Sequence, residues 1–252
     1  MTSFHVGVQL HPQATTTDRI LGATVAAEEL GADSVWYWDH FFPLYGDPSA
    51  AHFEAYTLLA AAAVRTERVR LGALVTCNSY RNPNLLADMA RTVDHLSGGR
   101  FTLGIGSGWF ERDYDEYGYE FGTAGSRLAD LERDLPVIRE RLGVLSPPPV
   151  GPLPILIGGS GRRVTLRLVA EQASGWNTFG PPEHFAELNG VLDEWCNRVG
   201  RDPAEIERTV AIEPDDGRWD DYVAAGADHL IVMVRDPFDL DAVARLVDAA
   251  AG

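Results

Sequence analysis

The chain has 252 residues, with 21 basic and 37 acidic side chains and a formal net charge of −16. Its composition is that of an ordinary globular protein, and its length suits one α/β barrel. The acidic balance argues against a nucleic-acid partner, because proteins that bind the phosphate backbone carry basic surfaces. No apolar run is long enough to span a membrane, and the first residues lack the pattern of a secretory signal. We therefore expect a cytoplasmic protein without a membrane partner.

The amino-acid usage excludes several enzyme classes. All 21 basic residues are arginine, and the chain contains no lysine. Schiff-base aldolases, pyridoxal-dependent enzymes and P-loop NTPases each need a lysine amine, so none of these classes fits. Cys77 and Cys196 form neither a disulfide framework nor a metal cluster, and no His-Glu-x-x-His or His-x-His spacing occurs. We predict no metal site.

Short apolar segments recur along the whole chain, and we predict that they are β-strands. They do not alternate between apolar and polar residues, which is typical of strands covered on both faces. There are eight such segments: 5–10, 34–38, 69–76, 101–105, 154–157, 176–179, 209–212 and 229–234.

Helical patterns lie between these strands. Segments 20–30, 86–96 and 240–250 carry apolar residues at helical spacing, the first ending before Gly31 and the second beginning after Asn82-Pro83. Alternation of strands and helices over this length predicts a closed (β/α)8 TIM barrel of the α/β class, with a doubly wound sheet as the alternative. We interpret the proline-rich segment 146–154 as a stiff connection within a single domain, residues 1–252.

The active site of such a barrel forms where the strands end. Asp39 and His40 follow the second strand and could act as an orienting acid and a base, because histidine titrates near neutral pH. A structural role is an equal alternative, since neighbours on a strand point to opposite faces. The last two strands add little polar chemistry. The other strand-end candidates are Gln9, His11, Cys77, Asn78, Trp109, Trp176 and Asn177.

Two further segments could contribute to the site. The run Gly158-Gly159-Ser160-Gly161-Arg162-Arg163 follows the fifth strand and precedes a predicted helix. Glycines and a helix N-terminus suit a phosphate, although a simple glycine-rich turn is an equal alternative. An acidic segment is interpreted as a solvated lid or insertion; its charged residues are Glu111, Asp113, Asp115, Glu116 and Glu120.

Taken in order, these segments resemble the luciferase-like monooxygenase superfamily, and within it the oxidoreductases that use the deazaflavin coenzyme F420. The resemblance extends over nearly the whole chain. It is carried by Trp38-Asp39-His40 and by segments 71–83, 96–101, 106–111, 157–161 and 175–177. These motifs are specific for the superfamily but less decisive between F420 and FMN.

The resemblance implies a cofactor ring in the barrel mouth and a homodimer. Asp39 would contact the ring edge, and His40 would face the substrate and handle its proton. A bulge with a non-prolyl cis peptide at Leu74–Val75 would support the back of the ring. Gly106, Ser107 and Gly108 would follow the ribityl chain. The remaining cofactor residues would be Cys77, Asn78, Gly158, Gly159, Ser160, Gly161, Arg162, Trp176 and Asn177, with the Gly159–Gly161 loop at the phosphate.

The sequence departs from the family at several places. Segments 144–153 and 212–219 are short, so the insertion loops that shape a substrate pocket are reduced. In one branch of the family a glutamate serves as proton donor near Gly108, but Trp109 stands there, which makes Glu111 the nearest substitute. The resemblance implies hydride transfer between C5 of F420 and an unidentified small organic substrate. The alternatives are an FMN-dependent monooxygenase that uses O₂ and a non-catalytic flavin-binding or deazaflavin-binding barrel.

Overall fold

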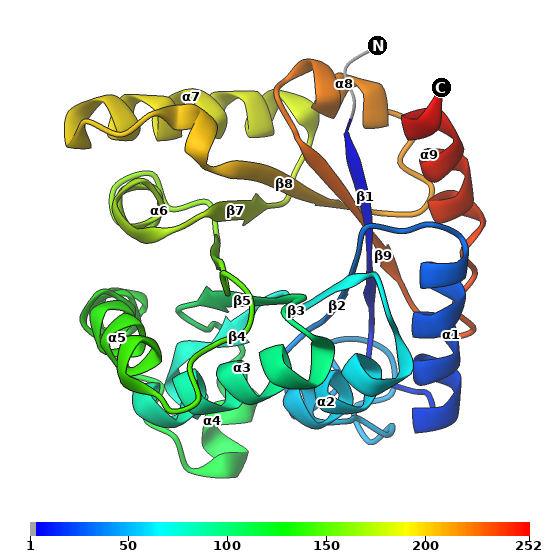
Figure 1. The fold of residues 1–252 in the computed structure, drawn as a ribbon, viewed down its shortest axis with the longest axis horizontal. Helices are drawn as coiled ribbons and strands as arrows, with labels where there is room; N and C mark the ends of the chain where they lie inside the picture. Colours follow the sequence, from blue (N-terminus) through cyan, green and yellow to red (C-terminus); the bar gives the residue numbers. More distant parts are fainter. Residues whose placement is uncertain (1–3) are drawn as a thin grey trace.

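The computed structural model describes residues 4–252. Its strands form one parallel sheet in the order β3-β2-β1-β9-β8-β7-β6-β5-β4, and β5 also pairs with β3. The sheet therefore closes into a barrel that carries helices on its outside (Figure 1). The strands are β1 (His5–Leu10), β2 (Ser34–Tyr37), β3 (Arg70–Ala73), β4 (Thr76–Cys77), β5 (Phe101–Gly106), β6 (Ile155–Gly158), β7 (Gly175–Thr178), β8 (Glu207–Ile212) and β9 (His229–Val234).

The barrel has eight strands by position, because β3 and β4 are two parts of one interrupted strand. β3 pairs with the start of β5 through Leu71 and Phe101, whereas β4 pairs with its end through Thr76 and Ile105. The predicted (β/α)8 fold is confirmed, and the doubly wound alternative is wrong. All eight predicted strands are present, with ends shifted by at most two residues in every case except the interrupted third.

Helices cover the barrel between successive strands. The three segments with helical spacing are confirmed as α1, α3 and α9. In α3, the Asn82 side chain caps the first turn by accepting from the Asn84 N–H, and Gly98 ends the helix at a φ of 68°. The helices are α1 (Thr17–Glu29), α2 (Ala55–Arg65), α3 (Pro83–Ser97), α4 (Glu111–Tyr117), α5 (Ala124–Val144), α6 (Thr165–Gln172), α7 (Pro182–Val199), α8 (Trp219–Ala224) and α9 (Asp241–Ala251), with 3₁₀ turns at Asn78–Tyr80 and Pro203–Glu205.

The proline-rich connection between α5 and β6 is fastened to the rest of the barrel. The buried carboxylate of Asp94 on α3 accepts from the N–H groups of Val150 and Gly151, at 2.7 and 3.1 Å. A Cβ on Gly151 would lie 2.4 Å from the carbonyl oxygen of Gly99, so only glycine fits this approach. The strands on either side, β5 and β6, are hydrogen-bonded neighbours in the sheet.

The barrel interior is packed with side chains below its open end. Trp36 is its largest member, and a Cβ on Gly72 would lie 2.5 Å from the Trp36 ring. The absence of a side chain at Gly72 thus makes the space for this indole. The interior cluster comprises Trp36, Leu74, Leu156, Ala211 and Ile231, each at most 4% exposed.

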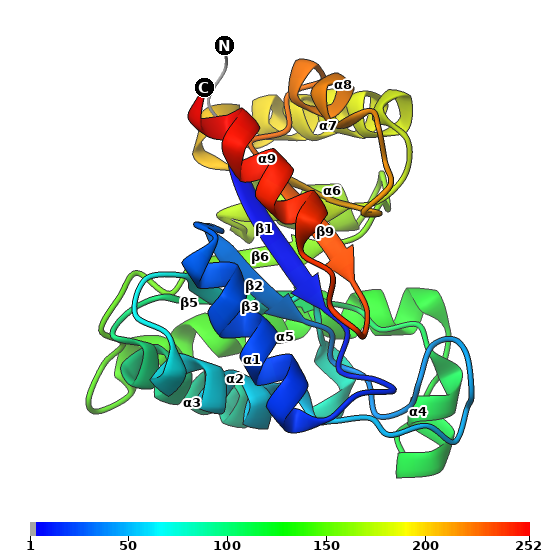
Figure 2. The same cartoon turned by 90° about the vertical axis from the view of Figure 1, so that its right-hand side faces the viewer.

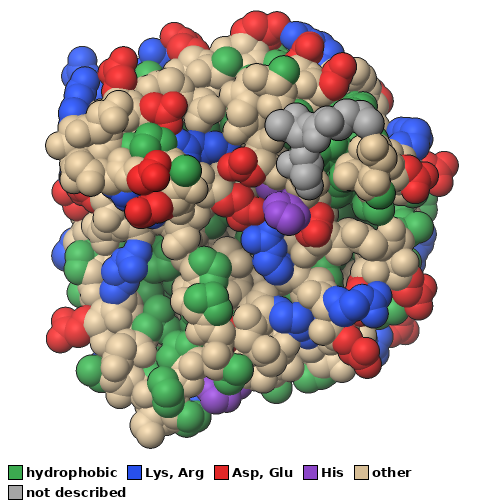
Figure 3. Space-filling model, turned by 45° about the horizontal axis from the view of Figure 1, so that its top comes forward, with side chains coloured by type: hydrophobic (Ala, Val, Ile, Leu, Met, Phe, Trp, Pro, Cys, Tyr) green, Lys and Arg blue, Asp and Glu red, His purple; other side chains and the backbone are tan. Residues whose placement is uncertain are grey.

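A polar network closes the N-terminal end of the barrel. The buried His229 ring contacts the Ser34 hydroxyl through Nε2 at 2.9 Å and the Glu207 carboxylate through Nδ1 at 3.1 Å. Arg70 donates to both Glu207 oxygens. Burial alone would raise the pKa of Glu207, but the His229 and Arg70 contacts hold it well below its usual range. Acidic and arginine side chains are interspersed across this face (Figure 3). The N-terminal end of such a barrel contributes to stability and not to catalysis.

We predict that Glu207→Ala lowers the free energy of unfolding by about 1–3 kcal/mol, because it removes the carboxylate that contacts the buried His229 ring and the partly buried Arg70 guanidinium. The Glu207 contribution is present at neutral pH and is lost as the pH falls through the folded-state pKa. Urea unfolding at neutral and acidic pH would measure both effects. Glu205→Ala is the control, since its exposed pair with Arg201 should contribute less than about 1 kcal/mol. Equal losses in the two variants would contradict this prediction.

Candidate active site

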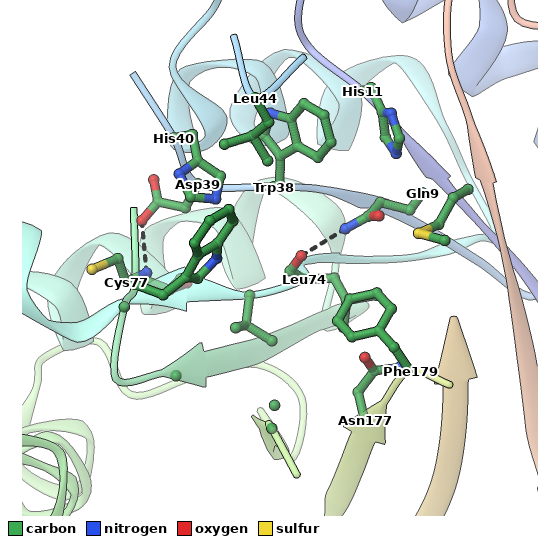
Figure 4. A pocket seen from close by; sticks show the side chains of 18 of the residues that line it. Gln9, His11, Trp38, Asp39, His40, Leu44, Leu74, Cys77, Asn177 and Phe179 are labelled. Carbon is green, nitrogen blue, oxygen red and sulfur yellow. Dashed lines mark hydrogen bonds between the residues drawn. The ribbon is translucent and has the colours of Figure 1, made fainter. Parts of the chain in front are cut away.

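A cavity of about 470 Å³ opens at the C-terminal end of the barrel. Figure 4 shows that side chains from several strands converge on it. Parallel strands in a closed barrel end at one face, which is why residues far apart in the sequence meet here. The lining residues are Gln9, His11, Trp38, Asp39, His40, Leu44, Tyr45, Leu74, Val75, Thr76, Cys77, Gly106, Ser107, Gly108, Trp109, Gly158, Gly159, Asn177, Phe179, Glu213 and Met233.

The interrupted third strand, formed by β3 and β4, provides the floor of this cavity. The Leu74–Val75 peptide bond is cis, as the family resemblance implied. The Gln9 side chain donates to the Leu74 carbonyl oxygen at 2.6 Å, so β1 holds the bulge in place (Figure 4). Val75 packs against the neighbouring strands β5 and β6. A Cβ on Gly106 or on Gly158 would come within 2.8 Å of the Val75 methyl groups. These two glycines therefore allow Val75 to lie at the cavity surface.

Asp39 is held by the chain that follows β4. Its carboxylate receives two hydrogen bonds from the Arg81 guanidinium, at 2.6 and 2.9 Å, and one from the Cys77 N–H at 3.0 Å. Arg81 also pairs with Glu54, the residue that caps α2. Both members of the Asp39–Arg81 pair are buried. The charge at the cavity edge is thus compensated, and Asp39 does not orient His40.

The acid that orients His40 is Asp113. Its Oδ2 lies 2.7 Å from His40 Nδ1 and also accepts from the Tyr80 hydroxyl at 2.8 Å. Its Oδ1 accepts from the N–H groups of Phe41 and Phe42. Asp113 is fully buried, so the prediction that the acidic segment is a solvated lid is wrong at this residue. The segment forms α4, which lies at the end of the barrel toward which the strands point (Figure 2).

Two predicted site residues that lie on or directly after a strand are turned away from the cavity. Trp176 is buried against α7, where its ring centroid is 5.5 Å from that of Phe185, and its Nε1 donates to the Gly159 carbonyl. The prediction that Trp176 closes the cofactor site is therefore wrong, although Asn177 beside it does line the cavity. Asn78 donates to the Asp134 carboxylate at 2.8 Å and lies behind the cavity wall.

Two charged residues predicted in the site also lie outside it. Glu111 is exposed at the start of α4 and does not line the cavity, which removes the basis for its predicted catalytic role. The Arg162 side chain forms an ion pair with Glu187 on α7 and is half exposed. Ser160 and Gly161 lie near Arg162, at the rim rather than in the wall.

The glycine-rich loop leaves a row of backbone donors at the barrel rim. The helix predicted after this run is present and starts at Thr165, and a turn occupies residues 162–164. Gly159 has a φ of 136°, which favours glycine. The N–H groups of residues 160–163 make no hydrogen bond to another described residue. Successive unpaired N–H groups ahead of a helix suit an anion, so the geometry favours the phosphate interpretation over a simple turn.

Sequence reasoning missed one wall of the cavity. Glu213 follows β8 and Met233 lies on β9, so the expectation that the last two strands add little is wrong. Leu44 and Tyr45 come from the loop after β2, and their sequence contexts gave no signal. Phe179 directly follows β7, at the end of the predicted strand 176–179. Within residues 4–252 no group of histidine, cysteine or acidic residues could hold a metal ion, and no helix could cross a membrane.

The chain is similar in sequence to known oxidoreductases. The profile of the luciferase-like monooxygenase family matches residues 1–231. An F420-dependent glucose-6-phosphate dehydrogenase from Intrasporangium calvum is 31% identical over 217 residues, which cover 75% of this chain and 63% of that protein. A 4-hydroxyprotoasukamycin monooxygenase from Streptomyces nodosus subsp. asukaensis is 29% identical over 201 residues, covering 73% and 53%. This chain thus spans less than two thirds of the length of either relative.

Solved structures share the fold at low sequence identity. An F420-dependent secondary alcohol dehydrogenase in complex with an F420–acetone adduct superposes with a TM-score of 0.86 and 17% identity, covering 100% of both chains. The FMN-bound oxygenating constituent of 3,6-diketocamphane monooxygenase from Pseudomonas putida gives 0.67 at 16% identity, covering 83% of this chain and 67% of that one. At these sequence identities the structural similarity shows the shared barrel fold alone.

The Asp39–Arg81 pair allows a test of how the site is held. We predict that Arg81→Met destabilises the protein by about 3–5 kcal/mol, because it leaves the Asp39 carboxylate buried without its partner. Adding Asp39→Asn to Arg81→Met should recover much of this loss, since the unpaired charge is removed. Urea unfolding of both single variants and the double variant would measure the coupling. Additive effects of the two changes would show that the pair does not hold the cavity edge.

Proposed function

Because the chain belongs to the luciferase-like monooxygenase family, we propose that it is an oxidoreductase that uses coenzyme F420. It would transfer a hydride between deazaflavin C5 and a small organic substrate. The observation that carries this proposal is the arrangement of His40, which lies in the cavity wall with one ring nitrogen held by buried Asp113. The F420-dependent relatives support the choice of cofactor.

The cavity residues fit a flavin-like ring and its phosphate. The Leu74–Val75 bulge offers a flat backing, and Asp39 lies at the cavity edge. Gly106, Ser107 and Gly108 would bind the ribityl chain. The free N–H groups of residues 160–163 would bind the phosphate at the rim. The bound cofactor supplies a carbon that donates or accepts a hydride, which no side chain can do.

The protein itself would handle the proton. Asp113 occupies Nδ1 of His40, so Nε2 is the nitrogen available to the cavity. A histidine held in this way can give a proton to a substrate oxygen or take one from it. The His40 ring is roughly perpendicular to the rings of Trp109 and Phe110, at 5.7 and 5.6 Å between centroids. These rings pack beside the imidazole.

The main rival is an FMN-dependent monooxygenase that uses O₂. The monooxygenase relative and the FMN-bound structure support it. A third possibility is a barrel that binds the cofactor without turnover. A homodimer is also part of our proposal and rests on the family resemblance alone, whereas the proposed cytoplasmic location rests on the sequence.

We predict that the purified protein binds F420 more tightly than FMN and that Gly161→Asp loses most of this affinity. A Cβ on Gly161 would lie 2.6 Å from the Thr165 hydroxyl, and the added carboxylate would repel the phosphate. Fluorescence titration with both cofactors would give the affinities. Gly22→Asp on α1 is the matched control, because its Cβ meets nothing within 4 Å and α1 lies across the barrel. Tighter FMN binding with NAD(P)H-dependent oxygen consumption would identify the monooxygenase instead.

We further predict that His40→Ala lowers kcat by about 10²–10⁴-fold with little change in F420 affinity. Asp113→Asn should lower kcat less, because an amide oxygen can still accept from His40 Nδ1 but carries no charge. Steady-state kinetics with a substrate found by screening, together with F420 titration, would test both variants. Parallel losses of F420 affinity would make His40 a residue that positions the ring and not a proton donor.

A further inference from the structure

One wall of the cavity is not used by the proposed cofactor contacts. It lies above the cofactor floor and comes from β9 and from the loops that follow β2, β5 and β7. Figure 4 shows Trp38 and Leu44 on one side of the cavity and Phe179 on another. The side chains are mostly apolar or aromatic: Trp38, Leu44, Tyr45, Trp109, Phe179 and Met233. Such a wall favours binding of an apolar substrate, because binding removes the apolar surfaces of the wall and of the substrate from water.

The polar group in this wall carries no charge at neutral pH. His11 stacks on Trp38 with 4.0 Å between ring centroids, and its Nδ1 lies 2.6 Å from the Tyr45 hydroxyl oxygen. Its Nε2 is buried and has no hydrogen-bond partner among the described residues. Burial, assisted by the nearby charge of Arg235, lowers the pKa of His11 to about 3. His11 therefore adds no cation to this wall.

The acidic side chains that line the cavity are Asp39 and Glu213. Among the described residues, no arginine lines it, and the chain has no lysine. Asp39 is compensated by buried Arg81. The other carboxylate is Glu213, whose partner Arg235 contacts it at 3.2 Å and lies over the Tyr45 ring, outside the lining. A phosphate or carboxylate entering here would meet Glu213 and would find no cation in the substrate wall to offset its desolvation.

We propose that the substrate is an uncharged alcohol or carbonyl compound with an apolar body, and that Glu213 excludes anionic substrates such as sugar phosphates. This inference rests on the proposed function of the same site. Oxidation of such an alcohol releases a hydride from carbon, which passes to the cofactor, and a proton from oxygen, which passes to His40. The reverse reaction reduces the carbonyl. The substrate class thus differs from the one in the name of the glucose-6-phosphate dehydrogenase relative.

The test compares matched neutral and anionic ligands on the F420-loaded protein. The probes are methyl 4-hydroxycyclohexanecarboxylate, the corresponding free acid and glucose 6-phosphate. Binding is followed by quenching of tryptophan fluorescence, and turnover by the absorbance of F420. We expect the ester to bind and react at least about tenfold better than the acid, and glucose 6-phosphate to do neither. Stronger binding of the acid or of glucose 6-phosphate would overturn the proposal.

A variant pair tests the role of Glu213. Glu213→Gln should shift the acid-to-ester ratio of affinities about fivefold toward the acid, the effect of one unit charge at contact distance in water. Glu194→Gln, which removes an exposed carboxylate on α7, should leave the ratio unchanged. An unchanged ratio in Glu213→Gln would remove this residue as the cause of exclusion.

The outcomes also separate this inference from the proposed function. If the protein binds F420 and prefers the ester but turns over no ligand, the substrate class stands and the hydride-transfer function fails. If it oxidises or reduces glucose 6-phosphate with F420, the function stands and the substrate class is wrong.

Discussion

The parallel sheet closes through its third strand, which is interrupted between β3 and β4. β3 and β4 pair with β5 at different heights. Leu74 and Val75 lie between them, outside both strands, and the Leu74 N–H donates to the Tyr37 carbonyl of β2. Gln9 bonds to the carbonyl of Leu74, and glycines on β5 and β6 leave room for Val75. The same interruption that completes the barrel thus makes the floor of its cavity. Every other site residue takes its place relative to this floor.

Buried side-chain contacts hold Asp39 and Asp113, and each contact joins distant parts of the chain. Asp39 is compensated by Arg81, and Asp113 contacts His40 from a helix beyond β5. A buried charge without a partner is costly, so each pair fixes the position of a loop as well as of a side chain. The adjacent residues Asp39 and His40 consequently have separate partners and separate roles.

All 21 basic residues are arginine, and several of them connect helices, strands and loops. Arg100 and Arg208 bind backbone carbonyls between helices and strands, while Arg81 holds the cavity edge. A guanidinium presents several donors in a fixed plane, which suits such bridging positions. These cations are used in the framework, and the substrate side of the cavity keeps an acidic and apolar character. The proposed preference for uncharged substrates follows from this distribution.

The sequence by itself determined the barrel, because strand burial and helical spacing are local patterns, and its motifs indicated the family. It also placed His40, Gly106 and Asn177 at strand ends, where a closed barrel brings them together. Only the tertiary structure decided which side chains face the cavity: it turned Trp176 outward and left Glu111 exposed. It also paired His40 with Asp113, 73 residues away. Contacts of this kind depend on how loops fold over the strand ends, and local sequence patterns carry no record of that geometry.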